Sequence, residues 1–333
     1  MALSAPQREN GASPEVPDVS FVVIGFNEDA HIGDCLESIF AQEGLVTYEV
    51  IVVDDASTDR TAETVRSLES IHPQLRLIRH SENLGRGASR RTGQDACVAS
   101  KIAFIDSDIR LPRDWLTRVT AALESADAIS GVAVPDGDCA VIWRMFGPKP
   151  KGMPGYWDLT GNNVIFRKTA LEQVGWPAAR RRSEDNRMAR AMVDAGMTVM
   201  TLKDLQVEHH EAKSYRRTLA HVYGTGYHAN EILRDLKIFR FPDLVWVCWF
   251  LVLLGSIALA LIGVVPWWLA GAAMLALTIA VDVGAMFQRF YVRPAPLRWI
   301  AATCANLPLI ATYLVSRSLW SPRLLLRQSE TDL

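Results

Sequence analysis

The chain has 333 residues, of which 49 % are hydrophobic, and its formal net charge is −2 at pH 7. This length suits two average domains or one α/β unit with an appendage. Without an excess of basic or acidic residues, the composition gives no support to a nucleic-acid partner or to a solvating acidic tail. The five cysteines lack CxxC or paired spacing, so neither a disulfide framework nor a zinc site is expected, and a reducing compartment is the simpler interpretation.

Charge is unevenly distributed along the chain. From Asp243 onward there are six arginines, four acidic residues and no lysine, so an apolar C-terminal part follows a charged one. The N-terminus has no basic-then-apolar run, so a signal peptide is not expected. The predicted boundaries are a disordered polar leader over 1–17, an α/β domain over 18–212, an amphipathic interface region over 213–242, a membrane domain over 243–318 and a tail over 319–333.

Four short runs rich in β-branched and aromatic residues alternate with three helical patterns in the first third of the chain. The expected strands cover 19–25, 48–53, 75–78 and 101–105, and the expected helices cover 30–41, 60–70 and 88–99. Alternation of apolar strands with helices predicts an α/β fold in which helices cover a parallel sheet.

Polar residues stand where each predicted strand ends, namely Asn27-Glu28, Asp54-Asp55, Asn83 to Arg86, and Asp106-Ser107-Asp108. A turn or a helix cap explains any one group equally well, because Asn and Asp favour both places. Four groups at one edge favour a site, since ligands bind outside the carboxyl ends of parallel strands. Two carboxylates one residue apart can address one hard cation, so the last group predicts binding of Mg²⁺ or Mn²⁺.

Four segments in this order resemble the inverting family 2 glycosyltransferases of GT-A fold. They are VVIGFNE over 22–28, VIVVDDASTD over 50–59, NLG over 83–85, and DSD over 106–108. The resemblance extends over about residues 19–215. It implies a GT-A domain with a Rossmann-like mixed sheet over 18–212 and a nucleotide-sugar donor, which would be a UDP-, GDP- or dTDP-sugar.

The resemblance also implies roles at the donor site. The residues assigned to the nucleotide pocket and its surroundings are Phe26, Asn27, Glu28, Asp54, Asp55, Asn83, Arg86 and Asp106. Asp55 would meet the base, since a carboxylate can accept the imide N–H of uracil. Asp108 would bind the metal, and Asp106 would contact the metal or the ribose. The metal would neutralise the departing nucleoside diphosphate.

Two later motifs resemble the acceptor side of the same family, Gly161-Asn162-Asn163 and Glu184-Asp185. The two acids begin an amphipathic helix, so N-terminal capping is the alternative interpretation. The family's Glu-Asp motif makes Asp185 the general base and Glu184 the second choice. An acceptor hydroxyl needs such a carboxylate within hydrogen-bond reach to take its proton.

Two further groups extend the predicted site. His209 and His210 follow a predicted strand over 202–207, and the resemblance implies that such a His completes the metal shell. The Val-x-His spacing favours His209, and the alternative is that neither has a role. Arg216 and Arg217 would clamp a diphosphate. The chain lacks the Gln-x-x-Arg-Trp motif of processive relatives, which favours transfer of a single sugar.

Two long apolar stretches and a weaker third predict a membrane domain of two to three helices. Residues 244–265 carry no charge, and 22 residues in a helix span roughly 33 Å. Residues 267–287 are interrupted only by Asp282, and residues 299–316 contain Asn306 and a proline. The loop over 288–298 has three arginines, so the positive-inside rule places it and the N-terminal domain in the cytoplasm.

A complete third span would place Arg317, Arg323 and Arg327 outside, against the same rule, so residues 299–316 could instead be re-entrant or interfacial. The predicted protein is a metal-dependent inverting glycosyltransferase in the inner membrane. It passes a sugar to a hydroxyl of a lipid-linked or glycan acceptor.

Three alternatives stay open at this point. A polyprenyl-phosphate glycosyltransferase has an acceptor phosphate that is already ionised and needs no base. A small membrane transporter component would use Asp282 and Asn306. A nucleotidyltransferase usually has a Gly-rich phosphate loop after its first strand, and Gly25-Phe26-Asn27-Glu28 is not one.

Overall fold

The computed structural model describes residues 16–136, 159, 161–176, 184–210, 215–216, 218–220, 222–224, 226, 241–289 and 296–318. The predicted tail, most of the predicted leader and much of the predicted interface region lie outside these residues. The side chains of Glu184, Asp282 and Asn306 also lie outside them.

The first half of the α/β domain has the predicted strand–helix alternation. The strands are β1 (Val19–Gly25), β2 (Tyr48–Asp54), β3 (Leu75–Arg79) and β4 (Lys101–Asp106). The helices are α1 (Ile32–Phe40), α2 (Thr61–Glu69) and α3 (Arg86–Ala96). These four strands are mutually parallel in the order β3-β2-β1-β4, so their carboxyl ends share one edge.

The second half of the domain makes the sheet mixed rather than purely parallel. Its strands are β5 (Ile109–Arg110), β6 (Ala128–Asp136), β7 (Asn163–Arg167) and β8 (Val199–His210). Its helices are α4 (Trp115–Ala122), a 3₁₀ turn (Leu123–Ser125), α6 (Lys168–Val174) and α7 (Glu184–Asp194). β7 runs antiparallel to β4 and to β6, and the full order is β3-β2-β1-β4-β7-β6-β8-β5.

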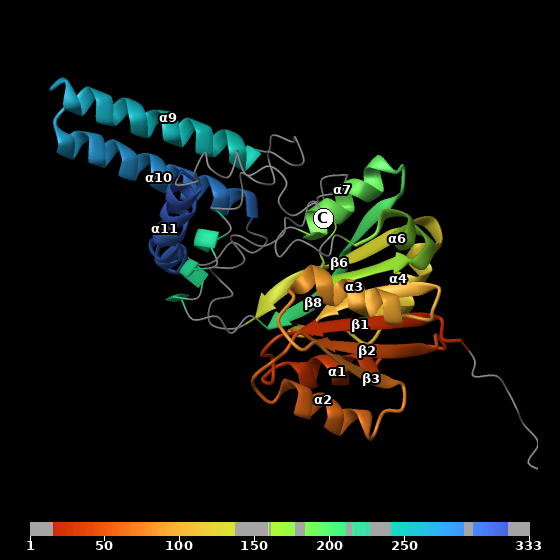
Figure 1. Cartoon of the computed structure of the whole chain (residues 1–333). Helices are drawn as coiled ribbons and strands as arrows, with labels where there is room; N and C mark the ends of the chain where they lie inside the picture. Colours follow the sequence, from red (N-terminus) through yellow and green to blue (C-terminus); the bar gives the residue numbers. More distant parts are fainter. Residues whose placement is uncertain are drawn as a thin grey trace, which may run out of the picture.

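Two apolar layers hold the sheet between helices (Figure 1). On one face, Phe21 and Val23 of β1 belong to a core that includes residues of α1, α2 and α4. On the other face, Val22 belongs to a core that includes Met188 and Met192 of α7 and residues of α6. The alternation of side chains along each strand therefore serves two cores, which explains why the strands are apolar throughout.

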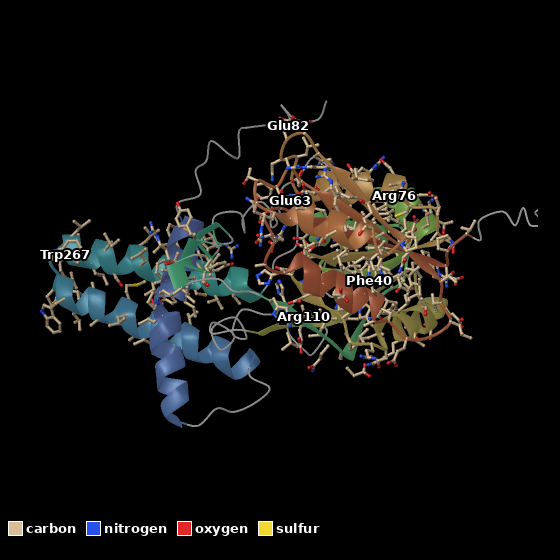
Figure 2. All side chains as sticks on the ribbon, turned by 90° about the horizontal axis from the view of Figure 1, so that it is seen from below. Phe40, Glu63, Arg76, Glu82, Arg110 and Trp267 are labelled. Atoms are coloured by element: carbon tan, nitrogen blue, oxygen red, sulfur yellow. The ribbon has the colours of Figure 1, made fainter. Side chains whose placement is uncertain are left out.

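Three helices form the C-terminal part, to one side of the α/β domain in Figure 1. They are α9 (Phe241–Leu261), α10 (Trp267–Arg289) and α11 (Pro296–Ser318). A small cluster of Trp249, Ile310 and Leu314 joins α9 and α11, and residues of α10 pack against it. Figure 2 shows Trp267 at the start of α10, far from the α/β domain.

Among the described residues, one helix is long and apolar enough to cross a membrane, over Leu244–Leu261. Only 11 % of this stretch is buried. The apolar run of α10 is shorter, over Trp267–Val281. The helices thus form where the sequence predicts them, and one of them passes the length and hydropathy test for a span.

Candidate functional site

One pocket opens at the edge of the sheet where β1, β2 and β4 end, with a volume of about 290 Å³. It is lined by the segments that follow these strands and by the first turns of α3. The lining residues are Ile24, Gly25, Phe26, Glu28, Asp55, Asn83, Gly85, Arg86, Ser89, Asp106, Ser107 and Asp108. Most of the predicted donor-site residues therefore meet in one cavity.

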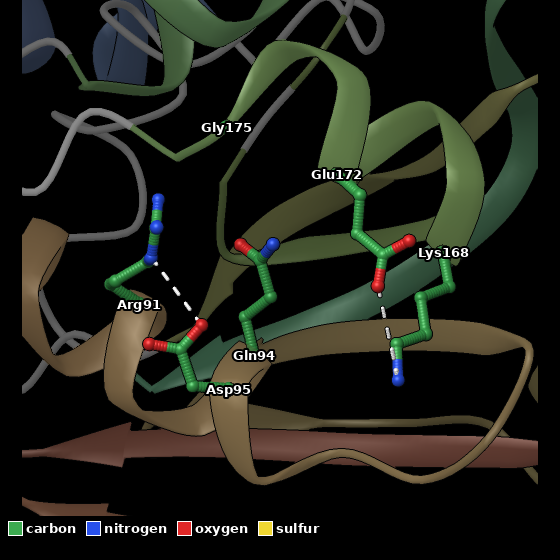
Figure 3. Close-up of a pocket in the computed structure, with 6 residues that line it drawn as sticks. All are labelled: Arg91, Gln94, Asp95, Lys168, Glu172 and Gly175. Atoms are coloured by element: carbon green, nitrogen blue, oxygen red, sulfur yellow. Dashed lines mark ion pairs between the residues drawn. The ribbon is translucent and has the colours of Figure 1, made fainter.

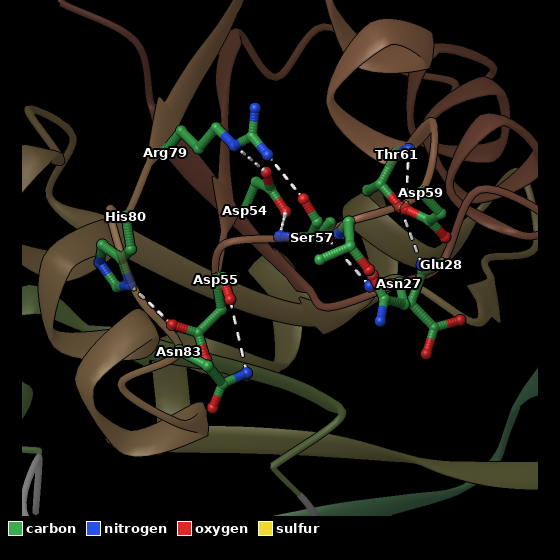
Figure 4. A network of polar contacts seen from close by, with 11 residues as sticks. Asn27, Glu28, Asp54, Asp55, Ser57, Asp59, Thr61, Arg79, His80 and Asn83 are labelled. Atoms are coloured by element: carbon green, nitrogen blue, oxygen red, sulfur yellow. Dashed lines mark hydrogen bonds and ion pairs between the residues drawn. The ribbon is translucent and has the colours of Figure 1, made fainter.

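The loop after β1 is locked to the loop after β2 (Figure 4). Asn27 and Ala56 both adopt positive φ, 57° and 64°, a region that non-glycine residues rarely occupy. The backbone N–H of Asn27 donates to Ser57 Oγ at 2.9 Å, and its Oδ1 accepts from the Thr58 N–H at 2.8 Å. Asn27 therefore joins the two loops and is not among the residues lining the pocket.

Two other acids of these loops serve as internal braces. Asp54 is fully buried, accepts the Ser57 N–H at 3.0 Å and lies 3.0 Å from the Nε of Arg79. It too lies outside the pocket lining. Burial opposes ionisation of Asp59, yet hydrogen bonds from Thr61 and from the backbone of Asp29 and Asp59 together outweigh it and lower the pKa of Asp59. Both carboxylates hold the loops in shape around the pocket.

Asp55 faces the pocket and fastens the loop before α3. Its oxygens accept the N–H of Leu84 at 2.9 Å and the N–H of Gly85 at 2.8 Å. His80 Nδ1 lies 2.8 Å from Asp55 Oδ1 (Figure 4). His80 Nε2 lies 2.9 Å from Thr92 Oγ1. Asp55 is thus oriented by three groups of its own chain, and His80 is in turn oriented by α3.

The two acids of the DSD motif have different neighbours. Asp106 Oδ1 accepts from Arg90 Nη2 at 2.8 Å. Asp108 Oδ2 lies 3.1 Å from His209 Nε2. This second contact follows from the sheet, because Ile109 of β5 is directly opposite His209 of β8. The final strand thus brings an imidazole to a carboxylate one hundred residues away.

His209 and His210 point to different surroundings. The backbone N–H of His210 donates to the carbonyl of Asp108 at 2.7 Å. Its ring stacks on His31 with centroids 6.0 Å apart. The side chain beside the Asp108 carboxylate is therefore that of His209, the residue favoured by its spacing.

The carboxylates make this edge electronegative. Burial raises the pKa of the Cys35 thiol, and the charges of Asp108 and Asp106 raise it further. Among the described residues, no three His, Cys, Asp or Glu side chains form a ready-made metal cluster. Asp106, Asp108 and His209 are carboxylate and imidazole donors of the type that Mn²⁺ accepts.

The Gly161-Asn162-Asn163 motif lies beside the DSD motif, because the Asp106 N–H donates to the Asn162 carbonyl at 3.1 Å. Asn163 is buried in β7, and its Oδ1 accepts the Trp115 indole N–H at 2.7 Å. Asp185, in the first turn of α7, is half-buried. A Cβ placed on Gly161 would lie 3.1 Å from Asp185 Cβ and 3.1 Å from both terminal nitrogens of Arg90. Asp185 therefore lies next to Gly161, whose carbonyl accepts a hydrogen bond from Arg90, the residue that also binds Asp106.

The remaining predicted residues are not gathered with these. Arg216 is exposed and does not line the pocket, and Arg217 lies outside the described residues. Glu184 begins α7. Conversely, His80 and Arg90 were missed by sequence reasoning, because their significance depends on the tertiary contacts with Asp55 and Asp106.

A second pocket of about 280 Å³ lies between α3 and the α6 segment (Figure 3). Its charged side chains form pairs within each helix, Arg91 with Asp95 at 3.4 Å and Lys168 with Glu172 at 4.0 Å. Such exposed pairs belong to an ordinary solvated surface. The first pocket is the better candidate for a catalytic site.

The sequence matches the family described as Glycosyl transferase family 2 over residues 20–186, about half of the chain. The chain belongs to glycosyltransferase family 2. The matched segment holds β1 to β7 and the whole pocket, so the predicted enzyme class is confirmed. The activity of this family is transfer of a sugar from a nucleotide-sugar.

A relative agrees with this assignment, and solved structures share the fold. The succinoglycan biosynthesis protein ExoO of Rhizobium meliloti (strain 1021) is 35 % identical over 190 residues, 54 % of this chain and 52 % of that protein. The chain thus spans about half the length of this relative. The mannosyltransferase PcManGT from Pyrobaculum calidifontis, solved with GDP-Man and Mn²⁺, has a TM-score of 0.57 at 21 % identity.

The match to PcManGT covers 95 % of this chain and 89 % of the PcManGT chain. S. aureus TarS 1–349, solved with UDP-GlcNAc, has a TM-score of 0.50 at 16 % identity and covers 90 % of each chain. These likenesses confirm the mixed α/β GT-A-like fold.

Proposed function

We propose that this glycosyltransferase moves one sugar from a nucleotide-sugar to a hydroxyl of a lipid-linked or glycan acceptor at the cytoplasmic leaflet, with Mg²⁺ or Mn²⁺ as cofactor. The observation that carries the proposal is the single pocket in which Asp55, Asp106 and Asp108 meet at the carboxyl ends of three strands. Solved structures of similar fold hold GDP-Man with Mn²⁺ and UDP-GlcNAc, which supports this donor class.

The donor nucleotide would occupy the pocket between the loop after β1 and the start of α3. Phe26 is 44 % exposed, so its ring is available to a base. Glu28 and Asp55 supply acceptors for ribose hydroxyls and for a base N–H. Arg86, in the first turn of α3, also lines the pocket, so its side chain supplies positive charge where a diphosphate would lie.

Asp106, Asp108 and His209 would hold the divalent cation. The fit rests on their chemistry and placement, with both carboxylates on the pocket wall and the imidazole 3.1 Å from Asp108. A site with few protein ligands suits a cation that completes its shell with substrate phosphates. When bound, the cation would neutralise charge on the leaving nucleoside diphosphate.

Asp185 would act as the general base. It sits in the first turn of α7, on the side of Gly161 that also faces Arg90. There it would accept the proton of the attacking acceptor hydroxyl, which is otherwise a poor nucleophile at neutral pH. Inversion follows from one in-line displacement by this hydroxyl.

The C-terminal helices would anchor the enzyme as a multi-pass membrane protein. The apolar side chains of α9 point outward, with Leu251 61 % and Leu254 49 % exposed. Trp267 and Trp268 stand exposed at the turn between α9 and α10, where membrane helices commonly place aromatic residues. The three arginines of residues 288–298 favour a cytoplasmic catalytic domain.

The decisive experiment screens the full-length protein in lipid nanodiscs against UDP-, GDP- and dTDP-sugars. We expect one donor class to raise the unfolding temperature and to be turned over, both only with Mg²⁺ or Mn²⁺. The Asp95→Asn variant is a control that should behave like the wild type, because Asp95 is an exposed acid outside the donor pocket. If no donor stabilises the wild type or is consumed, the proposed function is wrong.

A further inference from the structure

Arg90 is a buried cation beside Asp106 of the donor pocket, with 1 % of its surface exposed. A buried charge is costly unless it is paired and hydrogen-bonded. Its Nη2 donates to Asp106 Oδ1 at 2.8 Å and to the Gly161 carbonyl at 2.8 Å. Its guanidinium carbon lies 5.0 Å from the ring centre of Trp176. One side chain therefore contacts the end of β4, the segment before β7 and the aromatic residue after α6.

The same glycine connects this cation to the proposed base. A methyl group on Gly161 would be tightly packed, because its Cβ would lie 3.1 Å from both terminal nitrogens of Arg90 and from Asp185 Cβ. The neighbouring carbonyl of Asn162 accepts the Asp106 N–H at 3.1 Å. Asp106 and Asp185 thus both lie next to the segment of residues 161–162, and Arg90 binds that segment through the Gly161 carbonyl.

We propose that Arg90 is a positioning residue that fixes Asp106, on the donor side, relative to Asp185, on the acceptor side. This inference rests on the proposed function. A planar guanidinium holds its donors in a rigid fork and can stack on an indole, whereas a lysine ammonium is a flexible point charge. Displacement of reacting groups by about 1 Å can lower a rate ~100-fold. Arg90 would therefore govern the chemical step more than donor capture.

The test compares Arg90→Lys and Arg90→Ala with Arg91→Lys and Arg91→Ala in the full chain in nanodiscs. Arg91 is the matched control, since it follows on the same helix, is half-exposed and pairs with Asp95. We expect Arg90→Lys to lower kcat about tenfold or more and to change the donor KM less, and Arg90→Ala to lower kcat ~100-fold. The Arg91 variants should match the wild type in both constants.

A second readout does not depend on turnover. Calorimetric titration with MnCl₂ in the presence of UDP, GDP or dTDP should show weaker Mn²⁺ binding to both Arg90 variants, because Asp106 has lost its orienting contact. Unfolding temperatures identify any variant that fails to fold. If Arg90→Ala does not fold, Arg90→Lys decides.

Three results separate the two proposals. Folded Arg90→Lys with wild-type kcat, KM and Mn²⁺ affinity overturns the positioning role while leaving the proposed function intact. If the wild type turns over no donor, the proposed function is wrong. In that case, Mn²⁺ binding by the Arg90 variants decides whether Arg90 positions Asp106. A wild type that binds no Mn²⁺ with any of the three nucleotides overturns both.

Discussion

The α/β domain and the C-terminal helices use the same apolar residue types in opposite ways. In the domain, Val22 and Ile51 are fully buried, and buried charged groups such as Asp54 and Arg90 are held in ion pairs. In α9, Leu251 and Leu254 are largely exposed, although the helix contains almost no polar residue. A helix that is apolar on every side needs an apolar environment. The stability of α9 therefore depends on apolar surroundings outside the helix, whereas the α/β domain buries its own apolar side chains.

The two regions would therefore have different roles in the proposed reaction. The domain carries every described residue of the pocket, whereas the helices would bring an acceptor in the bilayer within reach of it. Activity on the donor and residence in the membrane should therefore be separable by substitution. A substitution that disables one region should leave the other region intact.

The largest expected effect is loss of activity in Asp108→Asn. The amide keeps the shape but weakens both metal binding and the contact with His209, so we expect donor turnover to fall by at least ~100-fold. Turnover is measured by release of the nucleoside diphosphate. The variant should remain in the membrane fraction like the wild type. Wild-type turnover in folded Asp108→Asn would contradict the assignment of the metal site.

Asp185→Asn tests the acceptor chemistry within the same domain. For a hydroxyl acceptor we expect a loss of about 10²–10⁴-fold in transfer, because the general base is removed. The donor affinity should be retained, as measured by thermal stabilisation with Mn²⁺ and the nucleotide-sugar. A phosphate acceptor would instead leave most of the activity, and this outcome would identify a polyprenyl-phosphate glycosyltransferase. Asp194→Asn, at the other end of α7, is the control.

The double variant Leu251→Lys with Leu254→Lys tests the membrane role of α9 while leaving the donor pocket unchanged. Each lysine near the centre of a membrane helix costs about 2.5–3.5 kcal/mol on insertion scales, so the double variant should be depleted from the membrane fraction. Donor turnover in detergent should stay within about twofold of the wild type. Leu251→Val with Leu254→Val keeps the face apolar and is the control. Unchanged membrane recovery of the lysine variant would refute α9 as an anchor.

Local sequence pattern predicted those parts of the molecule whose partners are near in sequence. β1, β2 and β4 are continuous apolar runs, and the acids that follow them mark the pocket edge. β6 was not predicted, because Ser130, Gly131 and Pro135 interrupt its pattern and its neighbours β7 and β8 come much later. Strand register, which is set by such distant pairing, is what the sequence alone could not supply.

The same reason explains which site residues were found. Asp106 and Asp108 stand in a recognisable motif, whereas Arg90 lies in an unremarkable basic helix and acquires its role only through Asp106 and Gly161. His80 follows β3 without any motif, and only the fold shows its contact with Asp55. The residues proposed to contact the donor or the metal stand in sequence motifs, whereas Arg90 and His80, which contact those residues, do not.

The smallest expected effects come from glycines, and they report how tightly each region is packed. In α3, a Cβ on Gly93 would lie 2.2 Å from Val22 Cγ1, so Gly93→Ala must displace β1 or the helix. Overpacking of this kind typically costs about 1–3 kcal/mol, and the unfolding temperature of the domain should fall accordingly. In α9 and α10, Gly255 and Gly271 have nothing within 4 Å of an added Cβ.

Alanine at Gly255 or Gly271 should therefore be tolerated, with a gain in helix propensity of up to about 1 kcal/mol. The measurement is thermal unfolding of the full chain in nanodiscs, with membrane recovery as the second readout. The sign of the change in unfolding temperature distinguishes the two regions. We expect a decrease for Gly93→Ala, and no change or an increase for Gly255→Ala and Gly271→Ala. A destabilising Gly271→Ala would mean that this face of α10 packs closely against protein, because lipid chains yield to a methyl group and a packed helix does not.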